Sequence, residues 1–465
     1  MKQQAGAART YSDKTVLVLG LGETGLSLLR WLSAQGATLR VADSRAAPPG
    51  LVEVAKYVRE DQVFCGAFTD SLLDGVDLIT ISPGVSLREA VVARAAARGM
   101  PVVGDVELFA RSLPPENRPH ILAITGSNGK TTVTSMVEHL CKAAGRDAVA
   151  AGNISPAVLD VVMQRGGHQP EIWVLELSSF QLETTSTLHA NAATVLNVSE
   201  DHLDRYDGMA DYAAAKARIF EGCGVSVFNR DDVRSTKMVE SLAQTARVSF
   251  GLDPAPTASD FGVERATDGL WLTQGVTRLL PASALQVAGL HNVANALAAL
   301  ALCRAIGLNM DALLAGLRTF QGLPHRVERV TTIRKVTYYD DSKGTNVGAT
   351  VAALEGLGCK AVLIAGGEGK GQDFSPLNAV AAQHARAVVL IGRDALLIEA
   401  ALQGSGVPVL HAQDMTDAVW QAAKSAQAGD AVLLSPACAS FDMFRNYAHR
   451  AVVFVAAVQE LARTR

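Results

Sequence analysis

The sequence predicts an α/β protein of three domains: a Rossmann-like N-terminal domain, a central P-loop domain with a parallel sheet, and a Rossmann-like C-terminal domain. Short apolar runs, typical of buried parallel strands, alternate with helical patterns along the chain. Its 465 residues correspond to about three domains. Proline- or glycine-containing breaks at 110–119 and 321–324 predict domains at residues 1–111, 112–322 and 323–465.

The composition is that of an ordinary globular protein, with 49% hydrophobic and 19% charged residues. The net charge of −4 argues against a nucleic-acid binder held by bulk positive charge. The six cysteines form no C-x-x-C pair, so neither a zinc site nor a disulfide framework is indicated. The polar N-terminus and the absence of a long apolar run predict a cytoplasmic protein without membrane insertion.

The first domain opens with a pattern typical of dinucleotide-binding proteins. A strand at 15–19 leads into GLGETG (20–25) and a helix, and the next strand ends at Asp43, where a ribose-binding acid is expected. This pattern predicts a Rossmann-like unit and allows a nicotinamide-dependent oxidoreductase. A later strand ends at the SPG turn (82–84), which is either a ligand site or a plain turn.

The second domain begins with a predicted phosphate-binding loop. An apolar strand at 121–124 breaks at TGSNG (125–129), and Lys130, Thr131 and a helical pattern follow. Backbone N–H groups at such a helix start bind anionic oxygens, the lysine adds charge, and the threonine hydroxyl can ligate Mg²⁺. The loop is shorter than the common P-loop pattern, and the alternative is an incidental Gly-Asn turn.

Three further residues of this domain are candidate site residues, and each also has an ordinary structural explanation. Glu176 ends an apolar strand, where a P-loop enzyme places a carboxylate that organises Mg²⁺, or it is a solvated strand end. His202 follows a predicted strand at 194–198 and is either a metal ligand or a surface histidine. Lys216 lies in a predicted helix at 212–220, where a lone lysine usually belongs to a solvated face.

The rest of the second domain is less informative. Residues 225–285 contain several short strands, which we expect to leave the main sheet. Asn292 and Asn295 then open an Ala-rich helix that runs to Ala305. Their amides either cap this helix or contact the edge of a purine base.

The third domain repeats the α/β pattern. Its predicted strands cover residues 336–339, 361–365, 388–391 and 431–434, and a last helix covers roughly 446–463. Lys343 and Lys370 lie in polar loops that follow the first two strands. Such lysines suit carboxylate or phosphate groups, so the domain is expected to contribute to an anionic site between domains.

Eight motifs resemble those of the Mur ligase family, in the same order and over essentially the whole chain. They are GSNGKTT (126–132), LELSSFQLE (175–183), NVSEDHLDRY (197–206), GLHNVANALAAL (289–300), GLPHR (322–326), DDSKGTN (340–346), GGEGKGQDF (366–374) and SPACASFD (435–442). The second and third motifs are most similar to the member of the family that adds D-glutamate.

The resemblance implies an ATP-dependent ligase of peptidoglycan synthesis that joins D-glutamate to UDP-N-acetylmuramoyl-L-alanine. ATP would phosphorylate the terminal carboxylate, the D-glutamate amine would attack the acyl phosphate, and a tetrahedral intermediate would expel phosphate. The implied cofactors are ATP and Mg²⁺ at two sites, the implied partners are the two small substrates, and we expect a monomer.

The resemblance also implies the site residues. Catalysis would involve Lys130, His202, Lys216, Lys343 and Lys370. ATP would be bound by Gly126, Ser127, Asn128, Gly129, Lys130, Thr131, Thr132, Asn292, Asn295, Arg326 and Asp341. The substrates would contact Thr24, Asp43, Ser44, Arg45, Ser82, Gly84, Asn153, His202, Thr345, Lys370, Ser440, Phe441 and Tyr447. Mg²⁺ would be held by Thr131, Glu176, His202 and Lys216, with Lys216 carbamylated as in the family.

The chain departs from the family pattern at three positions. Glu23 is an acid in the turn expected near UDP, Gly344 stands where some members have alanine, and Ala451 follows Arg450 where members often have glycine. Three other functions stay open: another amide ligase of the superfamily, such as a folylpolyglutamate synthase; a nicotinamide-dependent oxidoreductase; and a non-catalytic nucleotide switch.

Overall fold

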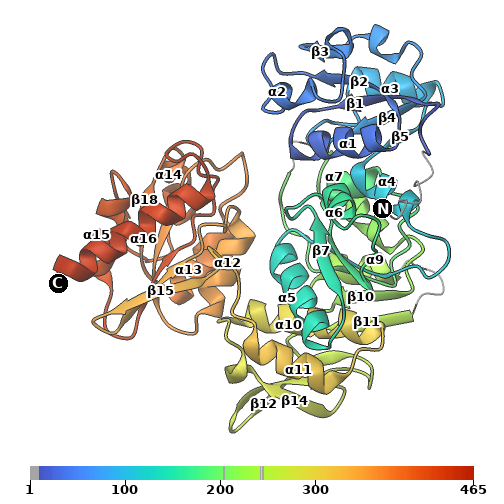
Figure 1. The fold of residues 1–465 in the computed structure, drawn as a ribbon. Helices are drawn as coiled ribbons and strands as arrows, with labels where there is room; N and C mark the ends of the chain where they lie inside the picture. Colours follow the sequence, from blue (N-terminus) through green and yellow to red (C-terminus); the bar gives the residue numbers. More distant parts are fainter. Residues whose placement is uncertain (1–9, 203–204, 241, 243–245, 465) are drawn as a thin grey trace.

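The computed structural model describes residues 10–202, 205–240, 242 and 246–464, and its strands form three separate sheets in succession along the chain (Figure 1). The first and third sheets lie on different sides of the middle one (Figure 1). The predicted three-domain α/β architecture is therefore confirmed. The boundary that we propose near residue 111 falls close to the end of helix α4 (Asp105–Ser112), and the one near 322 follows α11 (Met310–Thr319).

The first sheet has the strand order β3-β2-β1-β4-β5, and all its pairs are parallel. Its strands are β1 (Thr15–Leu19), β2 (Thr38–Asp43), β3 (Val63–Cys65), β4 (Leu78–Ile81) and β5 (Val102–Val103). Its helices are α1 (Glu23–Ala34), α2 (Leu51–Val54) and α3 (Ala90–Ala97). The central strands β1 and β4 are buried, which explains why they are mostly apolar in the sequence.

The middle sheet has nine strands in the order β14-β13-β12-β11-β10-β9-β6-β8-β7. They are β6 (His120–Thr125), β7 (Ala148–Gly152), β8 (Ile172–Glu176), β9 (Ala192–Val195), β10 (Val225–Asn229), β11 (Ala246–Phe250), β12 (Phe261–Ala266), β13 (Gly269–Gln274) and β14 (Thr277–Pro281). The helices are α5 (Lys130–Ala143), α6 (Val158–Gln164), α7 (Ser179–Glu183), α8 (Met209–Ala217), α9 (Val233–Glu240), α10 (Leu290–Ala305) and α11.

The expectation that residues 225–285 leave the main sheet is wrong. Strand β10 pairs in parallel with β9, β11 pairs with β10, and β12 to β14 continue the same sheet as antiparallel hairpins. Burial gives the reason, because Phe250, Phe261 and Leu280 lie in one core with α10. The strand predicted at 194–198 also shifts, since β9 ends at Val195 and the backbone then turns to bond Ser127 through the carbonyl of Asn197.

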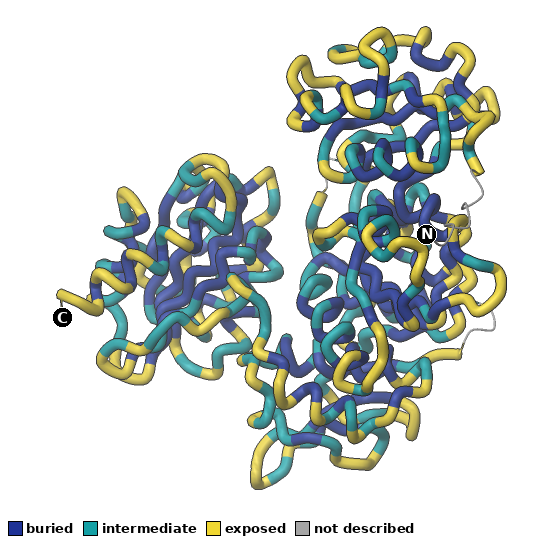
Figure 2. Tube along the Cα trace, in the orientation of Figure 1, coloured by how far each residue is buried: buried dark blue, intermediate teal, exposed yellow. Residues whose placement is uncertain are grey.

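The third sheet has the order β15-β16-β20-β17-β18-β19, parallel except for the β15–β16 hairpin. Its strands are β15 (Glu328–Ile333), β16 (Val336–Asp340), β17 (Ala361–Gly366), β18 (Ala385–Ile391), β19 (Val409–His411) and β20 (Ala431–Leu434). Its helices are α12 (Val347–Gly356), α13 (Pro376–His384), α14 (Ala395–Ala401), α15 (Met415–Ser425) and α16 (Tyr447–Thr464). Figure 2 shows buried chain through the centre of each sheet and exposed chain in the outer loops. Within the described part of the chain, no helix is long and apolar enough to cross a membrane.

The first and middle domains are joined by an aromatic contact and by ion pairs. Phe109 of α4 is fully buried and packs edge-on against Trp173 of β8, with ring centroids 4.8 Å apart. Arg30 of α1 pairs with Asp160 of α6 at 2.8 Å. Helix α4 therefore ties the first sheet to the middle one.

We predict that Phe109→Ala lowers the free energy of unfolding by about 3–5 kcal/mol, because it removes a buried ring and leaves a cavity beside Trp173. Urea unfolding followed by tryptophan fluorescence measures the loss. Phe64→Ala is the matched control, since Phe64 is 41% exposed. An equal, small effect of both substitutions would contradict the role of Phe109.

Candidate active site at the phosphate-binding loop

The predicted phosphate-binding loop joins β6 to α5, and its two glycines are required by geometry. Gly126 has φ +158°, and a Cβ there would lie 3.0 Å from the Leu196 Cβ atom. Gly129 has φ +82°, in the left-handed region, and a Cβ there would lie 2.9 Å from Asn295 Oδ1. Gly129 is also the N-cap residue of α5, and no side chain caps the helix. The first backbone N–H groups of α5 are thus available to an anion.

Lys130 holds the loop from the first turn of α5. Its Nζ atom donates to the carbonyl oxygens of Gly126 at 2.8 Å and of Ser127 at 2.9 Å. Burial lowers the pKa of Lys130, while the carboxylates of Glu176 and Asp201 oppose that shift. The ammonium group therefore lies against the loop that a phosphate would occupy.

Arg326 brings the third domain to the same loop. Its Nη2 atom donates to the hydroxyl oxygen of Thr131 at 2.7 Å, although the two residues are 195 positions apart. Burial lowers the pKa of Arg326, and the carboxylates of Glu176 and Asp341 act in the opposite direction. Positive charge from two domains thus meets at the start of α5.

Glu176 at the end of β8 has one satisfied and one unsatisfied oxygen. Its Oε1 atom accepts a hydrogen bond from Asn153 Nδ2 at 2.8 Å, whereas its buried Oε2 atom has no hydrogen-bond partner among the described residues. A buried carboxylate oxygen without a partner is costly unless a cation or donor satisfies it. The alternative of a solvated strand end is wrong, because Glu176 is 2% exposed. Its environment fits a Mg²⁺ ligand.

Lys216 is buried, so the general expectation for a lone helix lysine is wrong at this position. Its Nζ atom donates to the Gly126 carbonyl oxygen at 3.0 Å and lies 4.6 Å from the centre of the Tyr212 ring. Burial, together with the nearby charge of Lys130, lowers the pKa of Lys216 well below its ordinary value. Both effects disfavour the charged ammonium form relative to the neutral amine. Periodicity could not reveal this burial, because it comes from packing against the loop.

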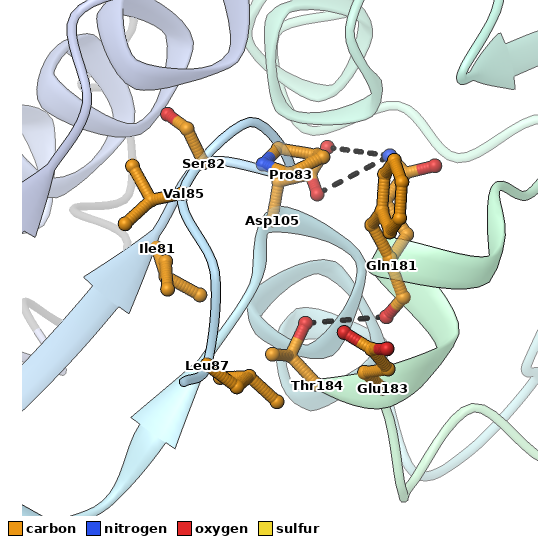
Figure 3. Close-up of a pocket in the computed structure, with 10 residues that line it drawn as sticks. Ile81, Ser82, Pro83, Val85, Leu87, Asp105, Gln181, Glu183 and Thr184 are labelled. Carbon is orange, nitrogen blue, oxygen red and sulfur yellow. Dashed lines mark hydrogen bonds between the residues drawn. The ribbon is translucent and has the colours of Figure 1, made fainter. Parts of the chain in front are cut away.

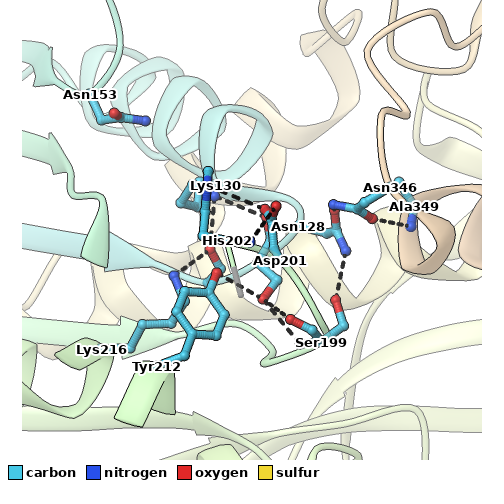
Figure 4. Close-up of polar contacts among 12 residues, drawn as sticks. Asn128, Lys130, Asn153, Ser199, Asp201, His202, Tyr212, Lys216, Asn346 and Ala349 are labelled. Carbon is cyan, nitrogen blue, oxygen red and sulfur yellow. Dashed lines mark hydrogen bonds and ion pairs between the residues drawn. The ribbon is translucent and has the colours of Figure 1, made fainter. Parts of the chain in front are cut away.

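His202 lies in the loop after β9, with φ +55°. Its backbone N–H donates to Asp201 Oδ1 at 3.1 Å, and its ring packs edge-on against Phe180 at 5.0 Å. Its ring also lies edge-on to Tyr212, with centroids 6.5 Å apart, so His202 and Lys216 both contact Tyr212. Figure 4 shows His202, Lys130 and Lys216 around the phosphate-binding loop. Leu203 and Asp204 of this motif lie outside the described residues.

Asn292 and Asn295 do not cap α10, so that alternative is wrong. The helix begins after Gly289 without a side-chain cap. Asn292 Nδ2 donates to the Ala288 carbonyl oxygen at 2.7 Å, and its Oδ1 atom accepts from Asn295 Nδ2 at 3.1 Å. Since Asn295 Oδ1 borders Gly129, this amide pair adjoins the phosphate-binding loop, where a nucleotide base would follow its phosphates.

In the third domain, Asp341 is fully enclosed beside the strand tips. Its Oδ2 atom accepts a hydrogen bond from Ser435 Oγ at 2.7 Å, and burial raises its pKa to about 7. Gly344 lies close to this carboxylate, since a Cβ there would be 2.5 Å from Asp341 Oδ2 and the Asp341 side chain would have to shift to admit alanine. Lys343 Nζ lies 3.9 Å from the centre of the Tyr447 ring, so these two predicted residues meet.

The other predicted residues of this domain differ in exposure. Ser440 is buried, Phe441 is 66% exposed, and Lys370 is exposed with φ +53°. Thr345 is partly buried, and its backbone N–H donates to the Lys343 carbonyl oxygen at 2.8 Å. An open surface at Lys370 and Phe441 suits a soluble ligand.

Sequence reasoning missed Arg450 as a contributor to this site. Arg450 is 1% exposed, and it donates to the Ser342 carbonyl oxygen at 2.8 Å and to the Cys438 carbonyl oxygen at 3.1 Å. Burial lowers its pKa to about 10. It joins the loop that carries Lys343 to the loop that carries Ser440. The adjacent Ala451 is fully buried.

In the first domain, the Asp43 carboxylate is already fully hydrogen-bonded by other groups of the protein. Its carboxylate accepts four hydrogen bonds, one from the Leu21 N–H and three from the backbone and guanidinium of Arg45, which lower its pKa to about 2. A carboxylate has about four acceptor positions, so a ribose hydroxyl would have to displace Arg45. This geometry argues against a ribose contact by Asp43 whichever nucleotide the domain binds, so it also disfavours Asp43 as the predicted substrate contact.

The glycine turn and the SPG turn of the first domain lie together. Ser82 Oγ donates to the Gly20 carbonyl oxygen at 3.2 Å, and Gly84 accepts a hydrogen bond from Arg205 of the middle domain at 3.2 Å. Glu23 accepts a 2.6 Å hydrogen bond from Ser155 Oγ, so this departure from the family pattern faces the middle domain. The remaining predicted residues of the first domain are Thr24, which is partly buried, and Ser44 and Arg45, which are exposed.

A small cavity separates the SPG turn from the middle domain (Figure 3). Gln181 Nε2 donates to both carboxylate oxygens of Asp105 at 3.3 Å across this junction. Burial raises the pKa of Asp105 to about 6. The SPG turn of the first domain thus lies beside Gln181 and Phe180 of the middle domain.

Three family models match the chain in succession. They are described as Mur ligase MurD-like, N-terminal domain (residues 14–104), Mur ligase middle domain (124–303) and Mur ligase, glutamate ligase domain (325–438). A UDP-N-acetylmuramoylalanine--D-glutamate ligase of Thiobacillus denitrificans is 57% identical, covering 98% of both chains. One of Nitrosomonas europaea is 54% identical, covering 97% of this chain and 98% of the relative.

Solved structures support the fold at lower identity. A pseudomurein peptide ligase type C from Methanothermus fervidus has a TM-score of 0.59 and 16% identity, covering 96% of this chain and 100% of that one. A UDP-N-acetylmuramate-alanine ligase from Thermotoga maritima has a TM-score of 0.58 and 20% identity, covering 96% and 99%. These likenesses extend over the three domains.

We predict that Asp341→Asn stabilises the protein increasingly as the pH rises from 5 to 7. The folded-state pKa of Asp341 is raised to about 7, above its unfolded value, so over this range the unfolded chain has lost a proton that the folded protein still holds, and the stability of the wild type falls until the pH passes about 7. Asn carries no such charge. Melting temperatures of both proteins across this range measure the effect, and a difference that does not change with pH would contradict the burial argument.

Proposed function

The chain belongs to the Mur ligase family, and we propose that it joins D-glutamate to UDP-N-acetylmuramoyl-L-alanine at the expense of ATP. The observation that carries the proposal is the meeting of Lys130, Arg326 and Glu176 at one phosphate-binding loop. The names of the relatives supply the substrates. We further propose that the protein acts as a monomer in the cytoplasm.

The chemistry that this site supports is transfer of the γ-phosphoryl group of ATP to a carboxylate. The N–H groups at the start of α5 and the Lys130 ammonium would hold the β- and γ-phosphates. Arg326, which reaches Thr131 from the third domain, would neutralise charge on the γ-phosphate. An enzyme promotes such a transfer mainly by positioning the reactants and neutralising their charge. The transfer is needed because a free carboxylate does not otherwise react with an amine.

Four residues would hold two Mg²⁺ ions: Thr131, Glu176, His202 and a carbamylated Lys216. The unpaired Glu176 oxygen supports the first site, and the lowered pKa of Lys216 supports the carbamate, because only a neutral amine adds to carbon dioxide. Bound Mg²⁺ would supply positive charge to the phosphate oxygens. Asn153 would keep Glu176 oriented through its 2.8 Å hydrogen bond.

The substrates would approach the loop from opposite sides. The first domain would bind UDP through residues 20–25, Ser82 and Gly84, leaving the alanyl carboxylate near Asn153. D-glutamate would bind to the third domain, where its carboxylates meet positive side chains. The proposed contacts there are Lys343, Thr345, Lys370, Ser440, Phe441 and Tyr447. The amine would then attack the acyl phosphate, and a tetrahedral intermediate would release phosphate and leave an amide.

The proposal is tested by phosphate release from ATP with UDP-N-acetylmuramoyl-L-alanine and a panel of amino acids. We expect release that depends on D-glutamate. Release with a different amino acid would overturn the assigned specificity and favour another amide ligase of the superfamily. ATP binding without release under any condition would favour a nucleotide switch.

We predict that Lys130→Ala lowers kcat by at least about a thousand-fold, because the site loses the charge that faces the transferring phosphoryl group. Phosphate release under saturating ATP measures the effect. Lys142→Ala is the matched control, since Lys142 lies near the other end of α5 and pairs with Glu138 at an exposed position. Near-normal turnover of Lys130→Ala would remove the phosphate-binding assignment.

We predict that Lys216→Ala inactivates the enzyme and that added short carboxylic acids partly restore its turnover. A carboxylate would replace the lost carbamate in the space that the side chain leaves. The measurement is the rate of phosphate release against formate or acetate concentration, with Lys237→Ala on α9 as the exposed-lysine control. The absence of rescue in a folded variant would argue against the carbamate.

A further inference from the structure

Asn346 makes a hydrogen bond across the domain boundary that the proposed function does not use. It is the N-cap residue of helix α12 of the third domain and is 9% exposed. Its Oδ1 atom accepts from the Ala349 N–H at 2.8 Å, which fixes the orientation of the amide. Its Nδ2 atom therefore points outward, and it donates to Asn128 Oδ1 of the phosphate-binding loop at 3.0 Å (Figure 4).

Asn128 is itself held firmly, so it is a rigid partner. Its backbone N–H donates to Asn197 Oδ1 at 2.8 Å, and its carbonyl oxygen accepts from Asn197 Nδ2 at 3.1 Å. Its own Nδ2 atom donates to Ser199 Oγ at 3.2 Å. Asn128 thus joins the phosphate-binding loop, the loop that leads to His202, and the third domain.

Gly348 gives an independent sign of this close approach. It lies in the first turn of α12, and a Cβ there would be 3.0 Å from Ser199 Oγ and 3.2 Å from Asn128 Nδ2. Such distances are shorter than ordinary contacts, so a larger residue would press α12 away from the loop. The first turn of α12 therefore fits against the two loops that surround the proposed phosphate site.

We propose that Asn346 is a positioning residue that sets the amino-acid-binding loop of the third domain against the phosphate-binding loop. The inference rests on the proposed function, in which Lys343 and Thr345 of the same loop contact D-glutamate. The bond to Asn128 fixes how far that loop stands from the acyl phosphate that the amine must attack. This hydrogen bond is made by the Asn128 side chain, whereas the Asn128 backbone N–H bonds Asn197.

The decisive variant is Asn346→Ser, which retains a capping oxygen for α12 and is too short to reach Asn128. We expect kcat/KM for D-glutamate to fall about ten-fold, while KM for ATP changes less than about two-fold, because misplacement affects the attacking amine. Asn309→Ser is the matched control. Asn309 caps α11 through the Ala312 N–H at 3.2 Å, and the same substitution there should leave both constants unchanged.

A double-mutant cycle with Asn128→Ala separates positioning from general damage. If the two amides act as a pair, adding Asn346→Ser to Asn128→Ala should cause no further loss. The proposal would be overturned if the double variant lost the product of the two single losses in kcat/KM. It would also be overturned if the Asn346→Ser enzyme matched the wild type. Should Asn346→Ser fail to fold, Gly348→Ala carries the same kinetic prediction, and its loss cannot come from a weaker helix because alanine favours helix.

A second measurement does not depend on the substrate assignment. Small-angle X-ray scattering should give a larger radius of gyration for Asn346→Ser than for the wild type and for Asn309→Ser. If the wild type does not use D-glutamate, the proposed function fails, and the scattering alone decides the positioning role. A larger radius then supports contact between the domains through Asn346, and an unchanged radius overturns it.

Discussion

The structure depends on the way the chain leaves β6 and enters α5. Gly126 and Gly129 adopt backbone conformations that other residues rarely adopt, and α5 begins without a side-chain cap. This leaves N–H groups that only an external anion or water can satisfy. The surrounding residues are arranged about this requirement, with Lys130 on the loop, Arg326 reaching it from the third domain, and Asn346 bonded to its side.

The same loop brings two lysines unusually close. Lys130 and Lys216 both donate to the Gly126 carbonyl oxygen, at 2.8 and 3.0 Å. Two ammonium groups at one oxygen repel each other, and burial adds to the cost of their charge. The more buried group, Lys216, takes the larger effect. The lowered pKa of Lys216 and the unpaired Glu176 oxygen are two separate features of the loop surroundings that fit a bound cation.

Much of this organisation could be predicted from the sequence, because it is local. The strand, glycine loop and helix of residues 121–140 follow one another, and Glu176 ends its strand as expected. Pairing between distant strands could not be predicted in this way. Residues 225–285 have ordinary strand patterns, and their pairing onto β9 together with burial against α10 makes them part of the main sheet.

The residues that sequence reasoning missed have partners far along the chain. Asn346 bonds Asn128 across 218 positions, and Arg450 bonds Ser342 across 108. Neither contact produces a periodicity or a motif of its own. Lys216 was placed at the site by family resemblance, whereas its burial and lowered pKa come from three-dimensional packing.

We propose that the γ-phosphoryl group passes to the substrate carboxylate at the Lys130 loop. The most direct test is to supply UDP-N-acetylmuramoyl-L-alanine labelled with ¹⁸O in the alanyl carboxylate and to analyse the phosphate by mass spectrometry. An acyl phosphate that is cleaved by the amine leaves one carboxylate oxygen in the phosphate, so we expect one ¹⁸O in each phosphate released. Unlabelled phosphate, formed together with the amide, would contradict it.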